Sequence, residues 1–174
     1  MTTGTWGTTG NADGLYIEYG TTKATTENVG EYVTYGDMRE INVRIPDLTL
    51  IGTGATVLAR NLKFPAGVRI ARVDVITDTV ATGTNAVLNI GLIKDDLSTE
   101  LDYNGLVAAI PVTSMDAAGE TTSLTAGSTY AGALLGTTLT DVGGYLTADY
   151  DTAAFTAGAL NVRIFYYGRG TITQ

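Results

Sequence analysis

GVRIARVDVITDTVATGTNAVLNIGLIK, residues Gly67–Lys94, is the stretch that decides the fold class of this chain. Its second half alternates strictly: one set of side chains is apolar, and the intervening positions include Asn89 and Gly91. The apolar set is Ala86, Leu88, Ile90 and Leu92. A period of two residues is typical of a β-strand that presents one face to a core.

The first half of this stretch is less regular. Val73 and Val75 share a face with Arg69, whereas Ile70 and Ile76 fall on the opposite face. Such a change of phase predicts a β-bulge near Ala71–Arg72, or a strand that is partly buried on both faces. The residues between the halves, Ala-Thr-Gly-Thr-Asn, suit a chain reversal, so we expect an antiparallel hairpin at the centre of a sheet.

Further strands are predicted on both sides of this hairpin. Met38–Ile45 alternates most cleanly, with Ile41, Val43 and Ile45 on one face. The other predicted strands are Thr56–Phe64, Ala131–Leu139, Gly144–Tyr150 and Leu160–Tyr167. One or two helical turns are expected near Leu106–Ile110, and a loop over Asp116–Gly127. About eight strands joined by Gly-rich turns predict an all-β protein, an antiparallel β-sandwich or jelly roll.

The first 36 residues differ in composition from the rest. Thr, Gly and Asn dominate Met1–Gly36, and few aliphatic side chains are present to build a separate core. Two interpretations stay open: a loop-rich layer folded onto the body, or an extended N-terminal arm that crosses a neighbouring subunit. In the second, the anchors are Trp6, Leu15, Tyr16, Tyr19, Tyr32 and Tyr35. Trp and Tyr suit such contacts because they bury a large area at low entropic cost. The predicted division is an arm over 1–36 and a β-sandwich body over 37–174.

Composition excludes several kinds of partner. The chain has 174 residues, enough for one domain, and a formal net charge of −8. An acidic surface repels phosphate, so binding to nucleic acid is disfavoured. No apolar run is long enough to cross a bilayer, and the first residues lack the pattern of a secretory signal. We therefore expect a protein that is soluble where it is made and has no membrane partner.

The absence of two residue types limits the chemistry further. The chain has no His and no Cys, which excludes Ser-His-Asp and Cys-His catalysis and zinc sites of the His/Cys type. Carboxylates are available at Asp95–Asp102 and at Asp149 and Asp151, and oxygen ligands of this kind can hold calcium. Their spacing fits no calcium loop, and solvated turns explain them better.

Tyr166-Tyr167 is interpreted as one ring in the core and one on the rim rather than a stacking platform. We predict no catalytic, metal or cofactor-binding residues.

Several segments together resemble the decoration, or cement, proteins of tailed-bacteriophage capsids. The segments are GLYIEYGTTKAT (Gly14–Thr25), GEYVTYGDMREINVRI (Gly30–Ile45), RIARVDVITDT and NAVLNIGLIKDD of the hairpin, TELDYNGLVAAI (Thr99–Ile110), DAAGETTSLTAG (Asp116–Gly127) and AAFTAGALNVRIFYY (Ala153–Tyr167). The resemblance implies a sandwich or jelly-roll body without enzyme activity. It also implies a homotrimer on the outside of an icosahedral head, assembled in the host cytoplasm, with the N-terminal segment helping to attach to the major capsid protein.

Two alternatives remain from the sequence. One is a component of a phage tail or head fibre, although the repeats of a fibre shaft are missing. The other is a carbohydrate-binding β-sandwich module, which surface tyrosines and acidic turns would suit.

Overall fold

The computed structural model describes residues 38–58, 63–64, 66–139 and 143–168. Within these residues the chain forms nine strands and two short 3₁₀ helices. In chain order they are β1 (Met38–Ile45), η1 (Leu48–Leu50), β2 (Thr56–Val57), β3 (Lys63–Phe64), β4 (Arg69–Thr82), β5 (Val87–Lys94), β6 (Glu100–Pro111), η2 (Val112–Ser114), β7 (Thr121–Leu124), β8 (Gly144–Asp151) and β9 (Ala157–Tyr167). Neither helix of the described residues is long and apolar enough to cross a membrane.

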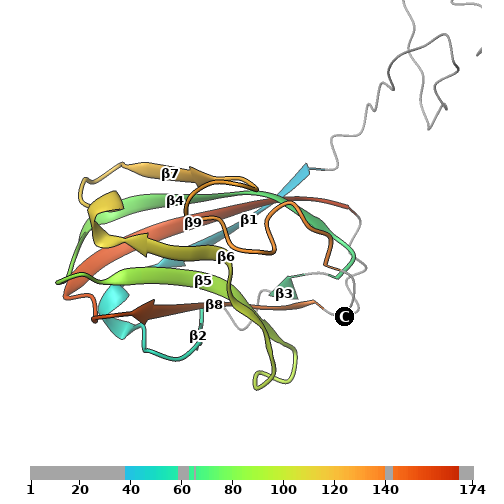
Figure 1. Ribbon diagram of the computed structural model, residues 1–174, viewed down its shortest axis with the longest axis horizontal. Coiled ribbons are helices and arrows are strands. Elements are labelled where there is room, and N and C mark those ends of the chain that lie inside the picture. The colour runs from blue at the N-terminus through green and yellow to red at the C-terminus, as the bar shows by residue number, and fades with distance from the viewer. Residues whose placement is uncertain (1–37, 59–62, 65, 140–142, 169–174) are drawn as a thin grey trace, which may run out of the picture. The chain divides into compact units, whose positions relative to one another are not determined.

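The strands form two antiparallel sheets that pack face to face (Figure 1). Sheet A has the order β1-β9-β4-β7, and sheet B has the order β2-β8-β5-β6, with β3 also pairing with β8. If β2 and β3 are taken as one interrupted strand, the first strand pairs with the last, the second with the last but one, and so on inward. This nested pairing in two four-stranded sheets is the jelly roll. The predicted fold class is confirmed.

The core fills the space between the sheets. The inner positions of β9 alternate with outward ones, and Leu160, Val162 and Ile164 are fully buried. Ile41, Val43 and Ile45 of β1 lie beside them in register and are buried as predicted. Leu88, Ile90 and Leu92 of β5 close the core from sheet B. Alternation in the sequence correctly identified the core-facing side of each of these strands, because successive side chains of a strand point to opposite faces of the sheet.

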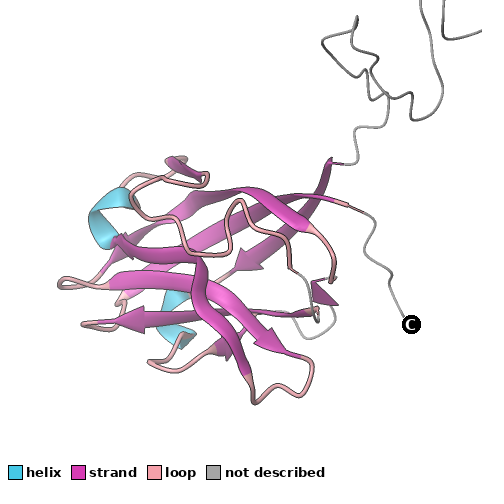
Figure 2. Cartoon of the chain, turned by 45° about the vertical axis from the view of Figure 1, so that its right-hand side comes forward, coloured by secondary structure: helices cyan, strands magenta, loops and turns pink. Residues whose placement is uncertain are grey.

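The predicted central hairpin is wrong. β4 pairs with β7 and β9 in sheet A, whereas β5 pairs with β6 and β8 in sheet B, so the turn after β4 carries the chain from one sheet to the other (Figure 2). Asn85 in this turn has a φ of 58°. Two strands with matching apolar faces can bury them either side by side or across a core. Alternation along one strand does not distinguish these arrangements.

The bulge in the first strand is confirmed. The register between β4 and β9 shifts between Ile70 and Arg72. The extra residue restores the phase, so that Ile70, Val73 and Val75 all point into the core.

Four other local predictions need correction. Leu106–Ile110 is not helical but lies in strand β6, where Leu106 and Val107 contribute to the core. Ala131–Leu139 is not a strand: it forms turns with two isolated bridges, from Ala131 to Val107 and from Thr138 to Arg69. Asp116–Gly127 is not only a loop, because it contains β7. The predicted strand Thr56–Phe64 is seen at its two ends as β2 and β3, and residues 59–62 lie outside the described part.

Candidate interaction surfaces

The predicted anchors of the N-terminal arm lie outside the described residues. They are Trp6, Leu15, Tyr16, Tyr19, Tyr32 and Tyr35. Their role stays a prediction, as does the division of the chain into an arm and a body. The candidate surfaces described below therefore all belong to the two sheets.

The outer face of sheet A gathers arginine side chains from three adjacent strands. Arg44 comes from β1, Arg69 and Arg72 from β4, and Arg163 from β9; the chain has ten Lys and Arg residues in all. Each arginine precedes or follows a buried residue of its strand, so the pleat turns it outward. We call this surface, with the carboxylates Glu40, Asp74 and Asp78 beside it, the arginine face.

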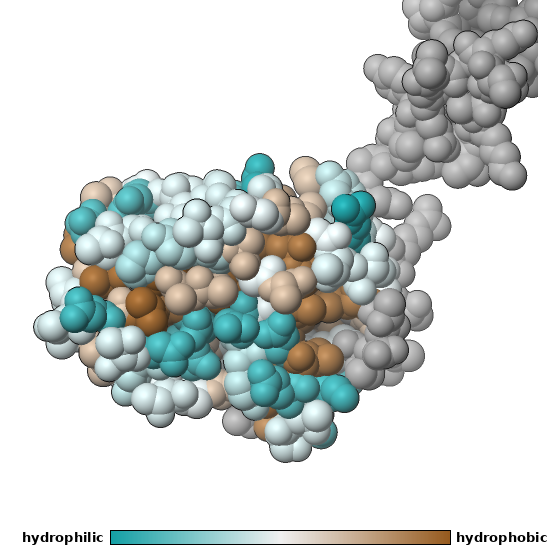
Figure 3. All heavy atoms as spheres, in the orientation of Figure 1, coloured by the Kyte–Doolittle hydropathy of each residue, from teal (hydrophilic) through white to brown (hydrophobic). Residues whose placement is uncertain are grey.

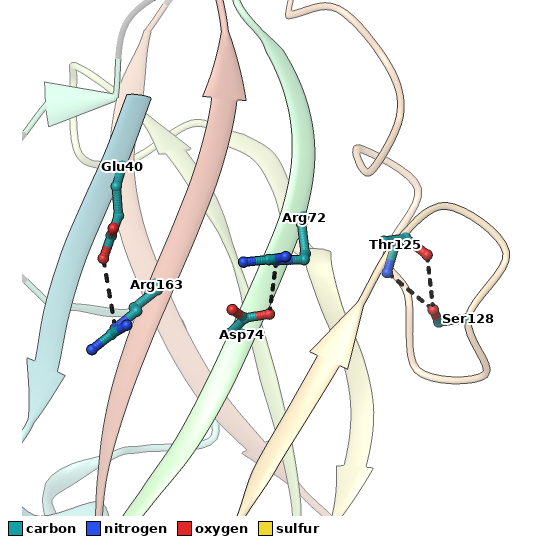
Figure 4. A network of polar contacts seen from close by, with 6 residues as sticks. All are labelled: Glu40, Arg72, Asp74, Thr125, Ser128 and Arg163. Atoms are coloured by element: carbon teal, nitrogen blue, oxygen red, sulfur yellow. Dashed lines mark hydrogen bonds and ion pairs between the residues drawn. The ribbon is translucent and has the colours of Figure 1, made fainter. Parts of the chain in front are cut away.

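Ion pairs (Figure 4) and a cation–π contact with the Phe165 ring hold side chains of the arginine face in place. The guanidinium of Arg72 lies 4.2 Å from the centre of the Phe165 ring, and its Nε lies 3.1 Å from Asp74 Oδ1. Arg163 Nε lies 3.6 Å from Glu40 Oε1, across β9 and β1. Side chains held in this way lose little further freedom when a partner binds. Their ion pairs leave much of each guanidinium open, since the Arg72 and Arg163 side chains are 45% and 44% exposed.

An exposed apolar pair adjoins the arginines. Met38 and Tyr167 are register partners on β1 and β9, and they are 50% and 48% exposed. Arg69 is the partner of Tyr167 on the other side. Tyr166, one residue earlier, is 8% exposed and packs against Phe64 in a tilted arrangement, with ring centres 5.3 Å apart. The prediction of one core ring and one rim ring is thus confirmed. An exposed tyrosine and methionine beside arginines have the composition of a protein-binding surface.

The outer face of sheet B carries carboxylates instead. Asp149 on β8 is the register partner of Asn89 on β5, and Asp151 follows two residues later on the same face. Asn89 Nδ2 donates to Asp151 Oδ2 at 2.8 Å, and its Oδ1 accepts from the Ala109 backbone N–H at 2.8 Å. Asp149 is only 8% exposed, and its Oδ1 is buried without a hydrogen-bond partner. The sequence prediction that both carboxylates face water is therefore wrong for Asp149.

Burial has an electrostatic consequence at Asp149. Loss of solvent raises the pKa of its carboxyl above the ordinary value, and the Asn89 amide opposes that rise. The nearby charges of Asp151 and Glu100 raise the pKa further. We call the surface of Glu100, Asp149, Asp151 and the adjoining Asp96 the acidic face.

The strand β6 explains how these polar groups become buried. Its register against β5 slips several times, so that β6 has more residues than the strand it covers. A Cβ placed on Gly91 would lie 2.0 Å from Asp102 O and 2.3 Å from Tyr103 C. The β6 backbone therefore passes directly over the outer face of β5 at this glycine. No pattern in the sequence indicated this contact, although an interior strand glycine is a known sign of close backbone approach.

The β5–β6 turn extends away from the two sheets (Figure 1) and contains the predicted acidic stretch. Asp96 caps it: its Oδ1 accepts from the backbone N–H groups of Ser98 and Thr99 at 2.9 and 2.7 Å. The Thr99 hydroxyl donates to Asp96 Oδ2, and this hydrogen bond first, with the two backbone ones after it, holds the pKa of Asp96 well below its usual range. In the view of Figure 3, hydrophilic side chains cover the surface around this turn, and hydrophobic ones gather between the sheets.

Across residues 38–58, 63–64, 66–139 and 143–168, no three acidic side chains are grouped closely enough to hold a metal ion.

Comparison with known proteins shows the fold. The sequence matches no protein-family model and no curated protein. The structure is similar to a chain in the capsid of Ralstonia phage GP4, with 16% identity, a TM-score of 0.52, and coverage of 84% of this chain and 94% of that one. It is also similar to a chain in the capsid asymmetric unit of cyanophage Pam1, with 16% identity, a TM-score of 0.52, and coverage of 88% and 98%.

The class of protein is thus a jelly-roll β-sandwich whose two outer faces differ in charge. The solved structures reported above with the same fold come from phage capsids.

Proposed function

We propose that this chain is a structural protein of a tailed-phage virion, a decoration protein that binds the outside of the icosahedral head. The observation that carries the proposal is the extent of the likeness to the two capsid chains. The match spans 94% and 98% of those chains, so nearly all of each capsid chain shares this fold. The segments that resemble decoration proteins, among them the strands Met38–Ile45 and Ala157–Tyr167, support the same assignment.

The mechanism that we propose is stabilisation of contacts between capsomers. A protein that binds the assembled shell but not separate subunits stabilises the shell by mass action. The partner is the major capsid protein, and Met1–Gly36 is the segment that attaches to it. A homotrimer would strengthen a modest affinity per site through avidity.

The chemistry of the chain supports a non-enzymatic role at a protein surface. With neither His nor Cys, the chain lacks the usual nucleophile–base pairs. Its net charge of −8 disfavours contact with the packaged nucleic acid. Tyr166 is buried, which leaves no double-tyrosine platform at the end of β9 for stacking on a sugar.

The test is binding to heads that lack this protein. Purified protein is mixed either with such heads or with unassembled major capsid protein of the same phage, and binding is measured by co-sedimentation. We expect saturable binding to the heads, little binding to free subunits, and greater resistance of decorated heads to heat. Failure of the full-length protein to bind the heads would refute the proposal.

The arm is tested in the same assay. A variant lacking residues 1–36, and the single variants Trp6→Ala and Tyr16→Ala, are compared with the full-length protein. Truncating a residue that anchors an interface typically costs about 2 kcal/mol or more of binding free energy. Each Ala variant should therefore lose affinity for the heads on the order of 30-fold. Trp6→Phe is the matched control, because it keeps an aromatic anchor. Unchanged binding after the deletion would assign the capsid contact to the body instead.

A further inference from the structure

The two outer faces of the sandwich carry opposite charge. The arginine face has four guanidinium groups and three carboxylates, whereas the acidic face has four carboxylates and, in the turn beside Asp96, the ion pair of Lys63 with Asp95. The ion pairs of the described residues include all three carboxylates of the arginine face and none of the four on the acidic face. The charge on the acidic face is therefore not balanced by these ion pairs within the subunit.

Uncompensated carboxylates of this kind are unfavourable in the isolated subunit. Glu100 and Asp151 both raise the pKa of Asp149, which means that the three groups repel one another. Asp149 is also nine-tenths buried with an unpartnered oxygen. A cationic surface placed over this face would relieve the repulsion, and guanidinium groups are suited to it because each offers several donors in a plane.

We propose that the arginine face of one copy of this chain binds the acidic face of a second copy. The two surfaces belong to opposite sheets of the sandwich, so the contact joins different patches on the two partners. Because the outer faces of the two sheets point in opposite directions, such a heterologous contact stacks copies, and it closes into a ring only where the rotation between copies allows it. The proposal rests on the proposed function, in which copies of this chain associate, and names the surfaces that would join them.

The geometry suits this contact. The acidic turn after β5 extends from the body, and Asp96 holds its backbone in shape through two backbone hydrogen bonds. The arginine face is a sheet surface on which Arg72 contacts both Phe165 and Asp74. The exposed pair Met38 and Tyr167 beside it supplies the apolar contact area that charges alone do not provide.

The experiment is a charge exchange followed by sedimentation velocity. Arg44→Glu with Arg163→Glu reverses part of the arginine face, and Glu100→Lys with Asp151→Lys reverses part of the acidic face. Each pair of substitutions should weaken self-association at least tenfold. All four together in one chain should restore much of it, because the complementarity is then exchanged and not removed. Asp116→Lys is the matched control, since this exposed carboxylate belongs to neither face.

Salt provides an independent readout. Electrostatic association weakens as ionic strength rises. The self-association of the wild-type protein should therefore weaken as salt is added, and the variants in which one face is reversed should respond less. Circular dichroism and thermal unfolding confirm that each variant is folded.

Several results would overturn the inference. One is wild-type protein that stays monomeric at the highest concentration reached. The others are charge-reversed variants that self-associate like wild type, and a variant with all four substitutions that does not regain self-association. Binding to heads is measured on the same variants. Assembly that persists while head binding is lost would assign the arginine face to the capsid and refute the contact between copies, while leaving the decoration function intact.

Discussion

The guanidinium of Arg72 lies over the ring of Phe165, its register partner on the neighbouring strand, at 4.2 Å from the ring centre. Arg72 follows directly after the bulge at Ala71. If Ala71 were an ordinary strand position and not a bulge, the strand would keep its earlier phase, and Arg72 would point toward the core. One bulge therefore both completes the buried face of β4 and builds the centre of the arginine face.

Removing the ring should cost stability without unfolding the protein. Phe165→Leu keeps the apolar bulk but loses the cation–π contact, and we expect a loss of about 0.5–1 kcal/mol in the free energy of unfolding. Phe165→Tyr is the control, because it keeps the ring and should stay close to wild type. Urea titration measures both. Equal stability of the Leu variant and wild type would show that the stacking contributes nothing.

Replacing Asp149 by Asn should stabilise the protein, and more so at neutral than at acidic pH. The pKa of this carboxyl is raised in the folded state, mainly by burial. The folded state then holds its proton at pH values where the unfolded chain has released it, so stability falls as the pH rises from the unfolded pKa through the folded one. The amide of the Asp149→Asn variant carries no charge at any of these pH values, so the variant should not show this fall.

Thermal unfolding of wild type and Asp149→Asn at pH 4 and pH 7 measures this difference. The gap in melting temperature should widen toward pH 7. Asp116→Asn, at an exposed position, is the control and should show no widening. A gap that is the same at both pH values would mean that Asp149 is not protonated more readily in the folded protein.

Gly91 should not tolerate a side chain. In Gly91→Ala the new Cβ would meet Asp102 O at 2.0 Å, and backbone atoms cannot move aside as a flexible side chain does. Overpacking of this kind costs about 1–3 kcal/mol, and the β6 backbone must shift in addition. Gly54→Ala is the control, because nothing lies within 4 Å of its Cβ position. Chemical denaturation of both variants checks this, and a neutral Gly91→Ala would show that β6 does not cover the strand.

The Asn89 side chain should be needed for the outer face of sheet B. Asn89→Ala removes the acceptor of the Ala109 N–H and the donor to Asp151, and each partly buried hydrogen bond contributes about 0.5–1.5 kcal/mol. Asn42→Ala on the exposed face of β1 is the matched control and should change stability by less than about 0.5 kcal/mol. Similar stabilities for the two variants would contradict this role for the network.

Much of the fold could be predicted because burial on one face leaves a period of two in the sequence. Met38–Ile45 was predicted with its bounds, Gly144–Asp151 to within one residue and Ala157–Tyr167 to within three, and the bulge near Ala71 followed from the change of phase. β6 was misjudged because GLVAAIPV has helix formers, and its pairing with β5 overrides that local preference.

The candidate surfaces were less accessible to prediction. Arg44, Arg72 and Arg163 are far apart in the sequence, and they meet only because β1, β4 and β9 are neighbours in sheet A. Asp149 looks like a solvated carboxylate at a strand end, and it is buried because the outer face of sheet B is partly covered.

The sequence by itself determined the all-β class, the core-facing residues of the regular strands, the acidic balance and the lack of His and Cys chemistry. These are properties of composition and of local periodicity. Only the tertiary structure decided that β4 and β5 lie in different sheets, and that four arginines gather with paired carboxylates on the outer face of sheet A. The reason is that an alternating strand specifies which face is buried but not which strand pairs with it, and partner choice depends on the packing of the whole sandwich.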